Sequence, residues 1–147
     1  SIQHLFLGSH HQSSRPLMKK IFNIVPRWLP AILIMVVIFY FSAQPGEREI
    51  IEFNIRDYIS IRKVAHVLIY GFLALSYYHW LGVRPARYRL AWLLAIAYAI
   101  SDEFHQSLVP LRNASMIDIF LFDNIGAFTA LAWHFLRTRK NHEKEIK

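Results

Sequence analysis

The chain has 147 residues, which is room for one domain, and 54% of them are hydrophobic while 18% are charged. Soluble domains average roughly 45–50% hydrophobic and 25% charged residues, so this composition indicates a protein that is partly surrounded by lipid. The net charge of +7 is carried between long apolar runs, which argues against a nucleic-acid partner, and the absence of cysteine excludes disulfides and thiolate metal sites.

The N-terminal segment is set apart from the rest. Residues 1–17 are polar, contain histidine and follow no pattern, whereas Met18-Lys19-Lys20 is typical of a natural start. We therefore expect residues 1–17 to be a non-native or disordered extension. Residues 18–147 are predicted to form a single membrane domain.

Four apolar stretches predict an all-α, polytopic membrane protein with four transmembrane helices, at about 26–43, 64–81, 90–109 and 117–136. Each is long enough to cross a hydrocarbon core about 30 Å thick. One alternative for the first stretch is a cleaved signal peptide, but Phe41 stands where cleavage needs a small residue. The alternative for all four is a soluble bundle, which would show polar faces at the helical period, and residues 90–100 have none.

The basic residues predict the orientation, because cytoplasmic loops are enriched in Lys and Arg. One side would hold twelve of them: Arg15, Lys19, Lys20, Arg27, Arg84, Arg87, Arg89, Arg137, Arg139, Lys140, Lys144 and Lys147. The other side would hold five: Arg48, Arg56, Arg62, Lys63 and Arg112. Both termini are therefore predicted to be cytoplasmic.

The outer connection between the first two helices, Glu47 to Lys63, alternates apolar residues with charged ones and has no Gly or Pro after Gly46. This pattern predicts a short helix lying on the outer surface, half buried in the interface. An ordinary loop capping the bundle is an equal alternative.

Ionisable residues interrupt the third apolar stretch. Asp102 lies thirteen residues beyond Arg89, about 20 Å deep, and so roughly 10 Å short of the outer hydrocarbon edge. Charged groups at such depth normally face the interior of a bundle or a water-filled cavity. Helices two and four bring further polar residues to the same depth. The candidate site comprises Lys63, His66, Tyr70, Asp102, Glu103, His105, Gln106, Arg112, Asp118, Asp123 and Asn124.

A structural role is the alternative for this cluster. Asp102, Glu103 and Asp118 could pair with Lys63, Arg112 and His66 to lock the helices together, as polar groups often do between transmembrane helices. So many ionisable groups in so small a bundle exceed what packing requires, which favours a functional site.

The order of these motifs resembles the VanZ-like family of small bacterial membrane proteins, named for a teicoplanin-resistance protein. The resemblance is carried by Lys-x-x-His at residues 63–66, Asp-Glu-x-His-Gln at 102–106, Arg112, and Asp-Asn-Ile-Gly-Ala at 123–127. Residues 39–46, Phe-Tyr-Phe-Ser-Ala-Gln-Pro-Gly, also resemble the end of that family's first helix. The resemblance implies a role at the cell envelope, with lowered susceptibility to teicoplanin-type glycopeptides in the founding member.

One spacing departs from the family's pattern, in which we expect the acid of helix four and the next Asp or Asn four residues apart. Here Asp118 and Asp123 are five apart, about 140° around an ideal helix. Either a π-bulge absorbs the extra residue, or only one of the two acids faces the cluster.

Two functions stay open. The first is a non-enzymatic protein that binds a lipid-linked envelope component or a glycopeptide through the outer-leaflet site. The second is an intramembrane enzyme in which the acids and His66 or His105 perform acid–base chemistry on a lipid-linked substrate. No nucleophile stands beside a base, so the first is favoured. A metal site is not expected, because Glu-x-His is no established ligand spacing, and no cofactor is predicted. A proton-coupled carrier is a weaker third hypothesis. The sequence leaves the oligomeric state open.

Overall fold

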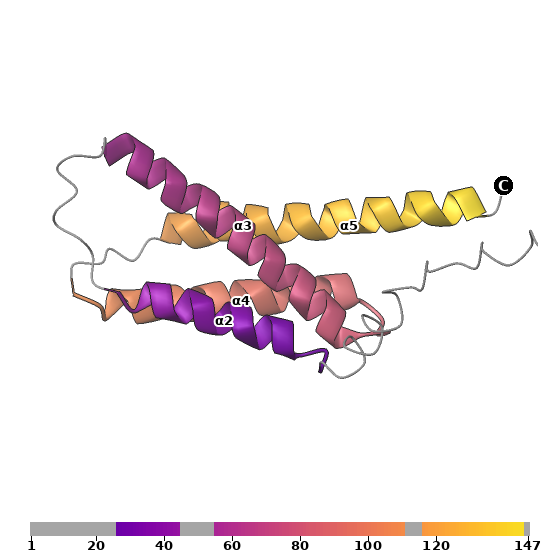
Figure 1. Ribbon diagram of the computed structural model, residues 1–147, viewed down its shortest axis with the longest axis horizontal. Helices are drawn as coiled ribbons and strands as arrows, with labels where there is room; N and C mark the ends of the chain where they lie inside the picture. The colour runs from indigo at the N-terminus through magenta and orange to yellow at the C-terminus, as the bar shows by residue number, and fades with distance from the viewer. Residues whose placement is uncertain (1–25, 45–54, 111–115, 146–147) are drawn as a thin grey trace, which may run out of the picture.

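The structure is a computed structural model, and it describes residues 26–44, 55–110 and 116–145. The described elements are all helical: α2 (Leu29–Ser42), α3 (Ile55–Leu81), α4 (Arg87–Ser107), the π-helix η1 (Asp118–Asp123) and α5 (Asn124–Glu145). Helices η1 and α5 run on without interruption, so four rods make up the described part of the chain (Figure 1). The all-α prediction is confirmed for these residues.

The four rods run alternately up and down, which places the start of α2 and the end of α5 at the same end of the bundle (Figure 1). Helix α3 is central, since it contacts α2, α4, η1 and α5. It crosses α5 closely, because a Cβ atom at Gly126 would overlap the backbone carbonyl of Val67. Small residues allow helices to approach in this way.

The bundle core is built from small and aromatic side chains. Ala91, Ala95 and Ala99 recur every four residues on one face of α4 and are completely buried. Tyr70 and Leu73 on α3 pack against this region. The same face of α4 continues into Glu103, so the alanine seam leads directly into the ionisable residues.

The outside of the bundle is unusually apolar. Large hydrophobic side chains stand exposed on every rod, for example Phe104 and Phe120, each 67% exposed. Helices Ile61–Leu81 and Ile119–Lys144 are long and apolar enough to cross a membrane, and Leu29–Ser42 is a shorter apolar helix. An exposed apolar surface of this extent is expected where the surrounding solvent is hydrocarbon.

The structure corrects the prediction for the outer connection. Residues 55–63 form the first turns of α3 rather than a separate surface helix or a loop. No Gly or Pro breaks the backbone hydrogen bonding between Ile55 and Val64, so the helix simply continues. Residues 47–54 lie outside the described residues.

The other helix bounds differ by a few residues, except at the C-terminus. Helix α5 continues to Glu145, nine residues beyond the predicted end at Leu136. The tail is rich in Arg, Lys and Glu, which are good helix formers, and it contains neither Gly nor Pro. The predicted extension at residues 1–17 lies outside the described residues.

Candidate functional site

Polar side chains gather at one end of the bundle, where α2 and α4 end and η1 begins (left in Figure 1). We call this set the polar layer; it comprises Ser42, Arg62, His66, Tyr70, Asp102, Glu103, Gln106 and Asp123. Five of them are among the most buried polar residues described, with Gln106 and Asp123 each only 1% exposed. The layer therefore lies inside the bundle, while apolar residues surround it.

Gln106 is the centre of a hydrogen-bond network that joins three helices. Its Nε2 donates to Oδ2 of Asp102 at 2.9 Å and to Oγ of Ser42 at 3.3 Å. Its Oε1 accepts from Nη2 of Arg62 at 3.2 Å. The Tyr70 hydroxyl also donates to Oδ2 of Asp102, at 3.3 Å. The Arg62 contact fixes which side of the Gln106 amide is the acceptor, and so directs the amide nitrogen at Asp102.

A second pair joins α3 to η1. Nδ1 of His66 lies 2.9 Å from Oδ1 of Asp123, and the ring of His66 stacks near Tyr70, with 6.1 Å between the ring centres. The Gln106 network and the His66–Asp123 pair thus meet on α3, where Tyr70 and His66 are one turn apart. A carboxylate bonded to Nδ1 holds an imidazole in a single orientation, which is also how metal-free acid–base sites position histidine.

The π-helix explains how Asp123 comes to lie there. The backbone of residues 118–123 has π geometry, in which hydrogen bonds run from residue i to i+5. This confirms the first of the two alternatives for the five-residue spacing, as far as the backbone is concerned. The side chain of Asp118 and the whole of Arg112 lie outside the described residues.

Three predicted residues point elsewhere. Lys63 places Nζ over the ring of Phe122, 4.8 Å from its centre, and not on an acid. His105 stacks on Phe39 of α2, with ring centres 4.5 Å apart. Asn124 accepts a hydrogen bond from the Trp92 indole at 2.8 Å. Each lies beside the polar layer, but none makes a described hydrogen bond within it.

Two members of the polar layer were not predicted. Arg62 is next to Lys63 in sequence, and successive residues differ by about 100° around a helix, so only one of them can face α4. The sequence offered no signal to choose between them. Ser42 lies at the end of an apolar helix, and its small polar side chain was noted in the Phe-Tyr-Phe-Ser motif without being assigned to the site.

The layer offers an unused acceptor. Oδ2 of Asp102 takes two hydrogen bonds, whereas Oδ1 is buried and accepts none from the residues that the structure describes. A buried carboxylate oxygen without a donor costs free energy, so it is a site at which a donor group of a ligand would be stabilised. Among the described residues no three His, Asp or Glu side chains are grouped as they would be around a metal ion.

The family can now be assigned. The VanZ/LLP1 family model matches residues 27–137, about three quarters of the chain, and the match includes every residue of the polar layer. The chain therefore belongs to the VanZ/LLP1 family. Neither the comparison with curated proteins nor that with solved structures gave a match.

Proposed function

We propose that this protein spans the bacterial inner membrane four times and binds an envelope component through the polar layer in the outer leaflet. By that binding it would lower susceptibility to teicoplanin-type glycopeptides. The observation that carries the proposal is the buried Oδ1 of Asp102, an acceptor that has no donor among the described residues. Hydroxyl and amino groups of lipid-linked sugars or of a glycopeptide are donors of the matching kind.

The membrane arrangement is supported by burial and by charge. Asp102 is 5% exposed while Phe104, two residues along the same helix, is 67% exposed, a distribution suited to hydrocarbon outside and polar groups inside. The alternating course of the rods puts the start of α2 and the basic end of α5 at one end of the bundle (Figure 1). The sequence predicts twelve of the seventeen Lys and Arg residues on that side, so that side would be the cytoplasmic one.

Asp102→Asn tests the proposal most directly. The amide oxygen can keep accepting from Tyr70 and Gln106, while the amide nitrogen replaces the acceptor Oδ1 by a donor. We expect the variant to insert normally but to lose protection in a teicoplanin-susceptible host, as measured by the minimal inhibitory concentration. Tyr88→Phe, which changes one hydroxyl at the opposite end of the bundle, is the matched control. If Asp102→Asn protects as well as the parent, Asp102 does not bind the component; if the parent itself gives no protection, the antibiotic role is wrong.

The enzymatic alternative is favoured by one observation, the pair formed by the partly buried His66 and the buried Asp123. An imidazole held by a carboxylate can take up and release a proton, so the pair suits acid–base chemistry on a lipid-linked substrate. Purified protein would be incubated with labelled lipid-linked envelope precursors. Turnover that His66→Gln abolishes would replace the binding function by catalysis, and bound but unchanged precursor would support binding.

A further inference from the structure

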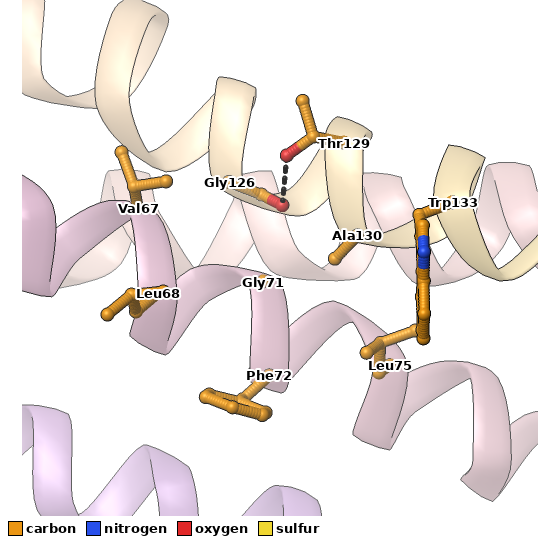
Figure 2. Close-up of a pocket in the computed structure, with 9 residues that line it drawn as sticks. All are labelled: Val67, Leu68, Gly71, Phe72, Leu75, Gly126, Thr129, Ala130 and Trp133. Carbon is orange, nitrogen blue, oxygen red and sulfur yellow. Dashed lines mark hydrogen bonds between the residues drawn. The ribbon is translucent and has the colours of Figure 1, made fainter.

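An apolar groove follows the crossing of α3 and α5, and its lining includes exposed side chains such as Phe72 and Trp133 (Figure 2). Its floor is formed where the two helices touch: a Cβ atom at Gly71 would lie 3.1 Å from the carbonyl oxygen of Gly126 and 3.3 Å from Cβ of Ala130. Phe72, Leu75 and Trp133 project on either side of this floor. The groove is thus bounded by long side chains.

The lining leaves little for a polar ligand to bind. The Thr129 hydroxyl already donates to the carbonyl of Ile125 at 2.6 Å and lies 3.3 Å from that of Gly126 (Figure 2). Except for the indole N–H of Trp133, the other lining side chains are hydrocarbon. A polar segment would lose its hydration there without compensation, so the part of a ligand inside the groove is a hydrocarbon chain.

A cation stands at one end of the groove. Lys63, Val67 and Gly71 are spaced by four residues and share one face of α3, so Lys63 lies one turn beyond the groove toward the polar layer. Its ammonium group lies over Phe122, which precedes Gly126 by four residues on the facing helix. Along α3 from Lys63 toward Gly71, the seam between the helices therefore presents an ammonium group and then hydrocarbon side chains.

We propose that this seam binds an anionic membrane lipid, with one hydrocarbon chain in the groove and its phosphate-bearing headgroup at Lys63. The proposal rests on the proposed function in that it requires the helices to lie in a bilayer. A second helix is a poorer occupant, because a helix with side chains is about 10 Å across and the groove is bounded closely by Phe72, Leu75 and Trp133. The charge at one end and the apolar walls together match an amphiphile.

Trp133 provides a reporter inside the groove. The chain has four tryptophans, and a variant with Trp28→Phe and Trp80→Phe keeps only Trp92 and Trp133. A second variant adds Trp133→Phe. The difference between the fluorescence of the two variants is the signal of Trp133. The protein would be reconstituted in phosphatidylcholine vesicles containing a small fraction of acyl-brominated phosphatidylglycerol or acyl-brominated phosphatidylcholine. We expect brominated phosphatidylglycerol to quench Trp133 at a mole fraction about fivefold lower than brominated phosphatidylcholine requires. One Lys beside an anionic lipid headgroup contributes about 1 kcal/mol, which corresponds to that factor.

Two variants separate the headgroup from the chain. Lys63→Gln should remove the preference for phosphatidylglycerol and leave quenching by both lipids equal. Thr129→Phe should fill the groove and reduce quenching by both. Its matched control is Thr138→Phe, because Thr138 makes the same bond to the carbonyl four residues earlier, at 2.7 Å, outside the groove.

The outcomes are distinct. Equal quenching by the two lipids in the parent, or an undiminished preference in Lys63→Gln, overturns the proposal while leaving membrane insertion intact. Absence of quenching by either lipid together with failure to float with vesicles would instead contradict the proposed membrane function. Because the chain has no cysteine, Thr129→Cys can report a second copy of the protein in the groove. Disulfide-linked dimers without quenching by lipid would also overturn the proposal that a lipid occupies the groove.

Discussion

The two ends of the bundle join the same helices by different chemistry. At the polar layer, the carboxylates of Asp102 on α4 and Asp123 on η1 bond to Tyr70 and His66 on α3. At the opposite end, which we call the aromatic end, α3, α4 and α5 are joined by ring contacts and one guanidinium group. It comprises Tyr78, Arg87, Tyr88, His134 and Phe135.

The contacts described at the aromatic end connect its helices without an acid. The ring of Tyr78 lies 4.4 Å from that of Tyr88 and 4.7 Å from that of His134, and the Arg87 guanidinium lies 4.2 Å over Tyr78. The Tyr88 hydroxyl and Nδ1 of His134 are 3.1 Å apart. No carboxylate takes part in these contacts. Since three helices can be locked in this way, the buried acids of the polar layer exceed what packing needs, which supports a functional role for them.

The largest effect is expected at the His66–Asp123 pair. Asp123→Ala leaves Nδ1 of the partly buried His66 without its carboxylate, and a hydrogen bond to a charged group contributes roughly 1.5–3 kcal/mol. Asp123→Asn keeps an acceptor oxygen and should lose less. The free energy of unfolding in mixed detergent micelles would be measured for both. Equal losses would mean that the charge of Asp123 is unimportant, and the contrast between the two ends would weaken.

A smaller effect is expected midway between the ends, at the helix crossing. Gly126→Ala forces α3 and α5 apart, because the new Cβ atom would overlap the carbonyl of Val67. Overpacking of this kind costs about 1–3 kcal/mol. The same unfolding assay would measure it, with Ala132→Gly as a test of ordinary helix propensity elsewhere on α5. A neutral Gly126→Ala would show that the crossing is looser than described.

The smallest effect is expected at the aromatic end. Tyr88→Phe removes one hydrogen bond to His134 and keeps the ring contacts, so the free energy of unfolding should fall by about 0.5–1.5 kcal/mol. Protection against teicoplanin should be unchanged. Loss of protection with normal insertion would place function at this end too, and would break the comparison on which the assignment of the polar layer rests.

Much of the polar layer could be predicted, for a definite reason. Asp102 and Gln106 stand out because acids and amides are costly inside an apolar helix, and their spacing of four puts them on one face. Counting depth from the basic residues brought His66, Tyr70 and Asp123 to the same level, and the structure does bring these side chains together. The roles of these residues stay predictions.

Which side chains of the polar layer bond to one another could not be predicted. Arg62 and Lys63 are both basic and adjacent, and the choice between them depends on how α3 is rotated against α4 and η1. His66 was equally available to several acids, and its pairing with Asp123, 57 residues away, is set by the crossing of α3 and η1. The outer connection was mistaken for a separate helix because an amphipathic pattern does not show whether its axis continues into the next helix.

The sequence by itself determined the helical class, the family and the presence of ionisable groups within apolar helices, because these follow from composition, local periodicity and motif order. It also raised the π-helix as one of two solutions to a five-residue spacing. Only the tertiary structure decided that the backbone adopts it and that Arg62 rather than Lys63 bonds to Gln106. It also decided that one oxygen of Asp102 has no donor among the described residues. Those facts depend on how the helices are rotated and crossed, and these follow from close packing at residues such as Gly126, which hydropathy does not encode.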